Sequence, residues 1–264
     1  MKIYFQIIKN TWDEYMVYRL NFILWRVRMV MQILVTYFLW WAIFSQRELF
    51  GGYTESMMLT YILLSSIVRT IVLGTTTMEV GEVINRGNLS NHLVRPLSFF
   101  SYYIARDIGD KLLNFMFSLV EIGLLFVILH PPVFLQMQPL VVLTAAAAVV
   151  IGAVLYFMFS MILGLLGFWT PDIWGPRFLS FVVMEFFAGG VFPLDILPQG
   201  IFLLTKGLPF YYFLYFPLGI YLGKISGWEL VNGFAMSFVW IFGLGILLRA
   251  LWLRGLKVYS AEGK

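Results

Sequence analysis

The sequence contains no cysteine, and only 12% of its 264 residues are charged. The missing cysteines exclude disulfides, iron–sulfur clusters and thiol chemistry. His92 and His130 are the only histidines, so a zinc site is not expected either. Soluble domains carry about a quarter charged residues, and a chain this poor in charge is expected to be an integral membrane protein.

Catalytic motifs are also missing from the sequence. It has no phosphate-binding GxxxxGK[ST] loop, so the chain by itself is not expected to hydrolyse ATP, and it has no HExxH. An aspartyl intramembrane protease would need paired catalytic carboxylates within its spans. Asp195 lies beside a predicted span but has no second carboxylate in its motif, so this class of enzyme is not expected. We expect no enzyme activity, metal or cofactor in this chain. The formal net charge of +4 arises from basic residues at span ends, so nucleic acid is not an expected partner.

Hydrophobic residues make up 61% of the chain, which has a mean hydropathy of +0.86. They form helix-length runs rather than ten-residue alternations, which predicts an all-α membrane protein with a single transmembrane domain over residues 1–264. Six spans are expected at about 29–44, 57–78, 112–129, 140–168, 178–191 and 230–248.

Lysine and arginine are distributed unevenly between the two sides of these spans. Fourteen of the 18 fall on one side, Arg69 lies within a predicted span, and only Arg47, Lys206 and Lys224 fall on the other side. Short basic segments remain in the cytoplasm. This rule places both termini inside, together with the tail at 249–264.

Residues 1–20 are predicted to form an amphipathic helix in the plane of the membrane interface. Tyr4, Ile8, Trp12 and Tyr15 recur at helical spacing, with polar residues around the rest of the wheel. Charged residues interrupt any apolar core, so a signal peptide is not expected. The alternative is a hydrophilic leader to the first span.

The longest polar interval, residues 79–110, lies between the second and third spans. A cytoplasmic segment of this length favours a docking site for a soluble partner, with a solvated loop that only anchors the span ends as the alternative. A helix stop is expected at Gly87, a second break before proline at Arg95-Pro96, and a short surface run at 99–108. The residues expected at the partner interface are Glu82, Arg86, Gly87, His92, Arg95 and Pro96.

Residues 193–224 are apolar and aromatic, yet four prolines divide them into pieces too short to span. Such broken pieces are tolerated at membrane depth when protein covers them or they line a cavity, so we expect short re-entrant helices on the outer side. The residues that mark this segment are Phe192, Pro193, Leu208, Pro209 and Pro217. The GxxxG spacing of Gly219, Gly223 and Gly227 fits either close helix packing or turns.

Three ionisable residues, Arg69, Glu121 and Glu185, lie within predicted spans. Counting from the span ends places each about 12–15 Å from the inner surface, near the bilayer midplane. A lone charge there costs at least about 2.5–3.5 kcal/mol, so we expect Arg69 to form an ion pair with one of the two glutamates. The cluster either shifts when a transport cavity opens or only fixes helix packing.

Four motifs resemble, in order along the chain, the permeases of type-2 ABC exporters. VINRGNLSNHLVRPL at 83–97 is similar to their cytoplasmic signature I-x-x-G-x-L-x-x-x-L-x-R-P-L. FFAGGVFPL at 186–194 resembles the end of their fifth span, and 208–223 resembles their outer re-entrant helices. GLKVYSAEG at 255–263 resembles the tail of a viologen-exporter-like subfamily, although Val258 stands where a second basic residue is common.

This resemblance implies a permease subunit of an ATP-driven exporter in a prokaryotic cytoplasmic (inner) membrane. It implies six spans, an interfacial N-terminal helix and a coupling helix between spans two and three. Because members of the family pack spans two and five near the transport path, the resemblance also makes Arg69–Glu185 the first choice for the ion pair. The implied partners are two copies of an ABC ATPase subunit, which hold ATP and Mg²⁺, a second permease chain, identical or paralogous, and membrane lipid.

Two other functions remain open from the residues alone. A secondary transporter could use the buried arginine and glutamates as a proton or ion site, although no inverted repeat is detectable. A membrane scaffold is the third possibility. The apolar span surfaces do not identify a substrate.

Overall fold

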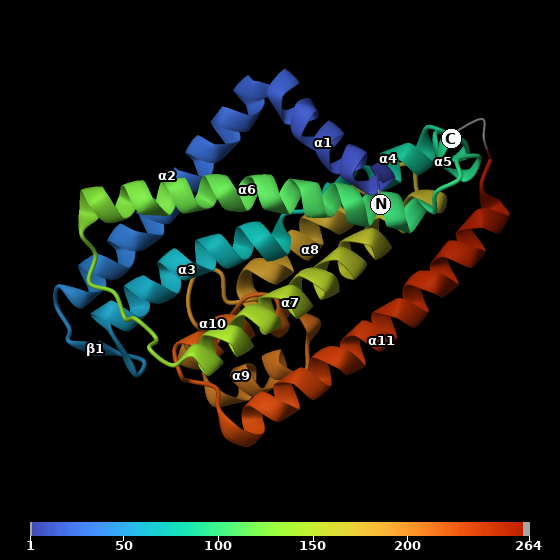
Figure 1. Ribbon diagram of the computed structural model, residues 1–264. Coiled ribbons are helices and arrows are strands. Elements are labelled where there is room, and N and C mark those ends of the chain that lie inside the picture. Colours follow the sequence, from blue (N-terminus) through green and yellow to red (C-terminus); the bar gives the residue numbers. More distant parts are fainter. Residues whose placement is uncertain (1, 261–264) are drawn as a thin grey trace.

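The computed structural model describes residues 2–260, and long helices connect its two ends (Figure 1). One end holds a hairpin of β1 (Leu49–Phe50) and β2 (Tyr53–Thr54) with the short helices α9 (Gln199–Lys206) and α10 (Tyr215–Tyr221). We call this the hairpin end. The opposite end holds the short helices α4 (Val80–Asn85) and α5 (Leu89–Leu93).

Five helices among the described residues are long and apolar enough to cross a membrane, which confirms the all-α membrane class. They are α2 (Arg19–Phe44), α3 (Glu55–Leu73), α6 (Phe99–Leu129), α7 (Pro139–Leu165) with the 3-10 turn η2 (Leu166–Phe168), and α11 (Gly227–Val258). The expected fifth span is α8 (Trp174–Phe187), whose 14 residues reach only about 21 Å against a ~30 Å hydrocarbon core. The predicted count of six spans is therefore not confirmed.

Two predicted boundaries are wrong. The expected surface run at 99–108 is not separate from the third span, because α6 starts at Phe99 and continues for 31 residues. Ser98 caps its start, with the hydroxyl accepting a hydrogen bond from the Ser101 N–H. The second span ends at Leu73, since Gly74 is extended and the 3-10 turn η1 (Thr76–Glu79) follows.

The other helices pack around α3 and α7. The first helix, α1 (Lys2–Val17), lies along α6 and meets α2 in an elbow at Tyr18, so the two form a V over α6 (Figure 1). Next, α3 packs against α2, α6 and α7, and α7 packs against α10 and α11. The largest core cluster joins α3, α7 and α10, and it is rich in tyrosine and phenylalanine.

The 193–224 region is divided into short pieces, as predicted. They are η3 (Leu194–Ile196), α9, η4 (Pro209–Tyr212) and α10. Pro193 precedes η3, Pro209 opens η4 after Leu208, and Pro217 lies in the first turn of α10. Gly223 and Gly227 have φ values of +71° and +56°, so these two glycines form turns.

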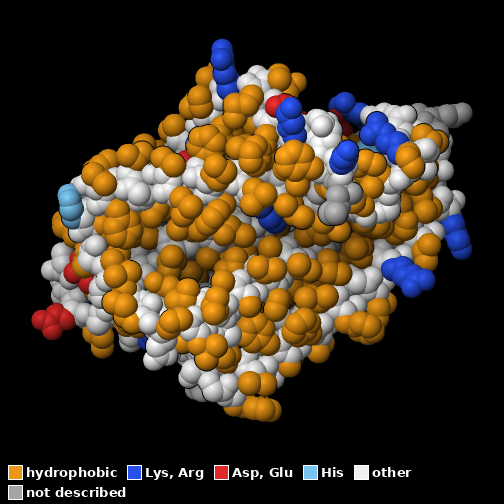
Figure 2. Space-filling model, in the orientation of Figure 1, with side chains coloured by type: hydrophobic (Ala, Val, Ile, Leu, Met, Phe, Trp, Pro, Cys, Tyr) orange, Lys and Arg blue, Asp and Glu red, His pale blue; other side chains and the backbone are white. Residues whose placement is uncertain are grey.

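Hydrophobic side chains cover much of the bundle face in Figure 2. The lysine and arginine side chains in this view gather toward the α4–α5 end and the elbow of α1 and α2. On α11, Val239 and Phe242 are 62% and 73% exposed. An apolar surface with lysine and arginine concentrated toward one end is typical of a bundle that spans a lipid bilayer.

Candidate functional site

Residues 76–98, which we call the short-helix segment, join α3 to α6 through η1, α4 and α5. α4 stops at Asn85, and Gly87 turns the chain with φ +73°, as the sequence predicted. Tyr259, just beyond α11, holds this turn: its hydroxyl donates to the Gly87 carbonyl and accepts from the Ser90 N–H at 3.0 Å. The segment is therefore tied to the end of the last helix. The predicted tail motif continues into 261–263, outside the described residues.

Four of the six residues predicted at a partner interface are exposed on this segment, namely Glu82, Arg86, Arg95 and Pro96. Glu82 and Arg86 form an i,i+4 ion pair of 2.6 Å with side chains 58% and 71% exposed. Such an exposed pair contributes little to stability. Gly87 is buried and only shapes the turn.

His92 is half-buried and points toward aromatic neighbours. Its ring centroid lies 5.6 Å from that of Phe99 and 5.0 Å from that of Tyr102. Burial lowers the pKa of His92, and the charges of Arg95 and Arg106 lower it further. A neutral histidine in this position packs the segment against the start of α6.

Three glycines bring α4 against the end of α7, a contact that the sequence did not predict. A Cβ atom on Gly167 would lie 2.8 Å from the Gly81 carbonyl oxygen, and one on Gly164 would lie 2.7 Å from the Cβ of Val80. Both distances are too short for a side chain. The GLLG spacing at 164–167 was the available signal, but it lies within an apolar run and resembles ordinary span sequence.

Arg177, in the first turn of α8, makes another connection that the sequence did not predict. Its guanidinium donates to the Thr77 carbonyl at 2.9 Å and to the Ser160 hydroxyl at 3.4 Å. It therefore joins α8 to both η1 and α7. From the sequence, Arg177 was only the basic residue of a short inner loop.

Arg69 on α3 and Glu185 on α8 form an ion pair, which was the first choice among the predicted pairings. The guanidinium donates to both carboxylate oxygens, with Nη2–Oε2 at 3.0 Å. The side chains are only 17% and 19% exposed. A Cβ atom on Gly190 would lie 1.9 Å from Nη2 of Arg69, so the pair depends on glycine at that position.

The chain after α8 leaves the helical conformation beside this ion pair, where Gly189 has φ +81°. Neighbouring helices satisfy its carbonyls. The Ala188 oxygen accepts from the Tyr215 N–H at 2.9 Å, the Gly189 oxygen from the Tyr61 hydroxyl, and the Val191 oxygen from the Trp40 indole at 3.2 Å. Non-helical backbone at membrane depth needs such partners.

Glu121 does not join Arg69 and Glu185, and the expectation of one cluster of three is wrong. Its carboxylate pairs with Arg26, with Nη2–Oε2 at 2.5 Å and side chains 7% and 14% exposed. The sequence placed Arg26 at the inner surface, before a span starting near residue 29. Because α2 begins at Arg19, Arg26 lies two turns inside the helix and reaches α6.

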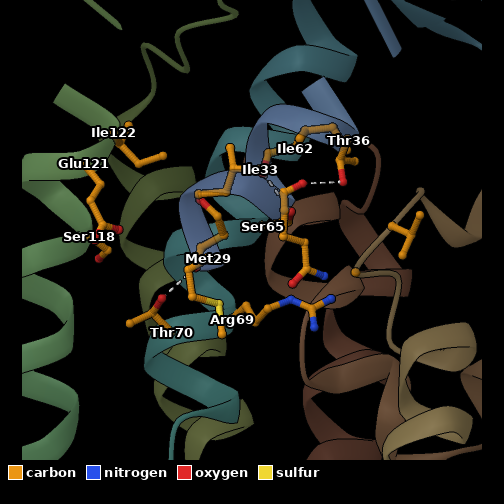
Figure 3. Close-up of a pocket in the computed structure, with 14 residues that line it drawn as sticks. Met29, Ile33, Thr36, Ile62, Ser65, Arg69, Thr70, Ser118, Glu121 and Ile122 are labelled. Atoms are coloured by element: carbon orange, nitrogen blue, oxygen red, sulfur yellow. Dashed lines mark hydrogen bonds between the residues drawn. The ribbon is translucent and has the colours of Figure 1, made fainter. Parts of the chain in front are cut away.

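A small polar cavity lies between the two ion pairs (Figure 3). Glu121 and Ser118 line it from α6, while Arg69 and Ser65 line it from α3. Its volume of about 40 Å³ has room for a few water molecules. Drug-sized ligands occupy pockets of roughly 300–1,000 Å³, so no ligand of that size fits here in this arrangement.

The 193–224 region closes the hairpin end of the bundle. The Tyr53 hydroxyl contacts both carboxylate oxygens of Asp195, at 2.9 and 3.1 Å, and Lys224 donates to the Gly52 carbonyl at 2.7 Å. Burial raises the pKa of Asp195. No group of three or more His, Cys, Asp or Glu side chains that could hold a metal occurs within residues 2–260.

Comparison with known proteins identifies the family. No curated protein matches the chain. The family described as "ABC-2 family transporter protein" matches residues 30–263. The match includes the short-helix segment, the 193–224 region and the residues of the two ion pairs other than Arg26. Because this match covers most of the chain, the protein belongs to the ABC-2 family of transporter proteins.

Proposed function

We propose that the protein is the permease subunit of an ABC exporter in a prokaryotic cytoplasmic (inner) membrane, with both termini in the cytoplasm. It forms the substrate pathway together with a second permease chain, identical or paralogous. Two copies of a separate ABC ATPase subunit bind ATP and Mg²⁺ and drive transport. The match over residues 30–263 to a family of transporter membrane proteins is the observation that carries this proposal.

The ATPase docks, in this proposal, on the exposed face of the short-helix segment. Glu82, Arg86 and Arg95 present charges there, while the backbone between them is held from several sides. The glycine contacts connect α4 to α7, Arg177 connects η1 to α8, and Tyr259 connects the Gly87 turn to α11. A displacement of this segment would therefore act directly on α7, α8 and α11.

The substrate pathway runs beside the Arg69–Glu185 pair in this proposal. That pair joins α3 to α8 at the point where α8 loses its helical hydrogen bonds. The adjoining cavity is too small for a substrate. Opening a pathway there requires α3 and α8 to separate or the 188–193 chain to move.

Charge reversal on the short-helix segment tests the proposal. Glu82→Arg and Arg86→Glu alter exposed side chains, so each is expected to change folding stability by less than about 0.5 kcal/mol. Each reversal should weaken co-purification of the ATPase subunit and abolish transport-stimulated ATP turnover in the reconstituted complex.

The matched control is Arg47→Glu, which reverses an exposed arginine at the hairpin end. It should leave ATPase binding and turnover unchanged. Unchanged binding and turnover in both test reversals would remove the short-helix segment from the mechanism.

A further inference from the structure

Two neighbouring cavities lie beneath the elbow of α1 and α2, away from the Arg69–Glu185 pair. The first has a volume of about 580 Å³ and is lined by α1, α2, α6 and the 73–79 chain. The second, of about 410 Å³, lies further along α2 and α6. Tyr15 and Phe22 line both cavities, so the two cavities adjoin at these aromatic side chains.

The first cavity carries an excess of negative charge. Glu14, Glu79 and Asp110 line it together with a single cation, Arg106, which forms ion pairs with both glutamates. Asp110 accepts hydrogen bonds from the Tyr15 hydroxyl and, at 2.9 Å, from the Asn114 amide. Lys111 also acts on Asp110, but it forms an ion pair with Asp107 at 3.1 Å. With this pair counted, four carboxylates stand against two cations, so the cavity attracts a cation.

Aromatic rings and carboxylates face this cavity together. Tyr18 and Trp25 line it beside the acidic groups, and aromatic faces attract ammonium groups. Burial is the main cause that raises the pKa of Glu79, and Glu14 raises it further although Arg106 opposes both. A bound ammonium group would stabilise the ionised form of Glu79.

The second cavity is mainly apolar. Its lining includes Met16, Ile23, Val27, Val30, Met31 and Phe117. Arg26 and Glu121 also line it, but they neutralise each other. Arg19, at the start of α2, is exposed and forms no ion pair with any described residue.

The two cavities follow one another along α6. The first cavity, which we call the acidic cavity, contacts Arg106, Asp110 and Asn114. The second cavity, which we call the apolar cavity, contacts Phe117 and Glu121. At about 1.5 Å per residue, the distance from residue 106 to residue 121 is roughly 22 Å. One leaflet of a bilayer, headgroups included, has about this thickness.

We propose that these two cavities bind one zwitterionic phospholipid with an ethanolamine headgroup. The ammonium group contacts Glu14 and Glu79, the phosphate contacts Arg19, and an acyl chain lies along α2 and α6 in the apolar cavity. An anionic phospholipid lacks the ammonium group and places its charge against the acidic cavity. This site goes beyond the export function, and its test requires neither the ATPase nor a transport substrate.

Native mass spectrometry of the full-length protein, purified in detergent and supplied with phosphatidylethanolamine or phosphatidylglycerol, tests the headgroup. Phosphatidylethanolamine should be retained about tenfold more tightly, and Glu79→Gln or Glu14→Gln should remove most of that preference. Glu48→Gln is the control, since Glu48 is exposed at the hairpin end and lines neither cavity. It should keep the preference.

A second pair of variants tests the acyl chain. Val27→Trp should fill the apolar cavity and reduce phosphatidylethanolamine retention about tenfold, whereas Val35→Trp, on the same helix but outside the cavity, should not. Glu14 is 53% exposed, so Glu14→Gln and Val27→Trp decide the question if Glu79→Gln does not fold. Equal retention of the two lipids, or equal losses in test and control variants, would overturn the proposal.

Discussion

Arg69 and Glu185 lie 116 residues apart in the sequence and meet in a two-pronged ion pair between α3 and α8. The pair sits where α8 ends and the chain continues through Gly189 and Gly190 without helical hydrogen bonds. It therefore fixes the end of α8, the expected fifth span. Depth along the spans predicted that Arg69 pairs with a glutamate, and the family resemblance favoured Glu185. The part of this pair in transport is a proposal.

Removing one partner of this ion pair should destabilise the protein. Arg69→Leu leaves the Glu185 carboxylate buried without a counter-charge, which is expected to cost about 3 kcal/mol. Arg69→Leu combined with Glu185→Gln should recover more than half of that loss. Thermal unfolding in detergent measures both. A double variant no more stable than Arg69→Leu alone would show that the pair does not form.

The two ion pairs should behave independently. Arg26→Leu strands Glu121 on α6, so Glu121→Gln should restore the thermal stability of Arg26→Leu. The same Glu121→Gln change should not restore Arg69→Leu, because Arg69 has a different partner. Rescue of both arginine variants by Glu121→Gln would instead support one shared cluster.

Gly190→Ala should mimic the loss of the Arg69–Glu185 pair. The added Cβ atom would lie 1.9 Å from Nη2 of Arg69, so the guanidinium must move away. We expect a lower melting temperature, and little further loss when Gly190→Ala is added to Arg69→Leu. Gly200→Ala is the control, since no atom lies within 4 Å of its Cβ position. Additive losses in the double variant would argue against the predicted clash.

Tyr259→Phe should loosen the short-helix segment without unfolding the bundle. It removes one hydroxyl that bonds both the Gly87 carbonyl and the Ser90 N–H, at an expected cost of about 1 kcal/mol. If the segment docks the ATPase, transport-stimulated ATP turnover should fall more than stability does. Tyr4→Phe, at an exposed tyrosine of α1, should change neither quantity. Full turnover in Tyr259→Phe would exclude this contact from coupling.

His92 should make stability depend on pH. Its pKa is lowered by burial, so below the ordinary histidine pKa of about 6.5 the unfolded chain binds a proton that the folded chain does not. The contribution of neutral His92 to the free energy of unfolding is therefore fully present above about pH 6.5. It is lost as the pH falls from there through the lowered pKa of the folded chain. As the pH falls from about 7.5 to 5.5, the melting temperature of His92→Gln should rise relative to that of the wild type. A difference that stays constant with pH would contradict this assignment.

The class of this protein, its family and the positions of its breaks follow from the sequence, because each depends on local properties. A bilayer requires runs of about 20 apolar residues, and these are visible without a structure. Gly87 and the prolines of 193–224 restrict the backbone wherever they occur, so the breaks they predicted are present. The family signature at 83–97 is likewise contiguous in sequence.

Only the tertiary structure decided which distant groups meet. The predicted depth of Glu121 was equally compatible with an ion pair to Arg69. Because α2 starts earlier than expected, Arg26 lies within the helix and pairs with Glu121 instead. Arg177 and Tyr259 looked like residues of an inner loop and a tail, yet both hold the short-helix segment. Such contacts depend on the packing of several helices at once, whereas sequence periodicity describes one helix at a time.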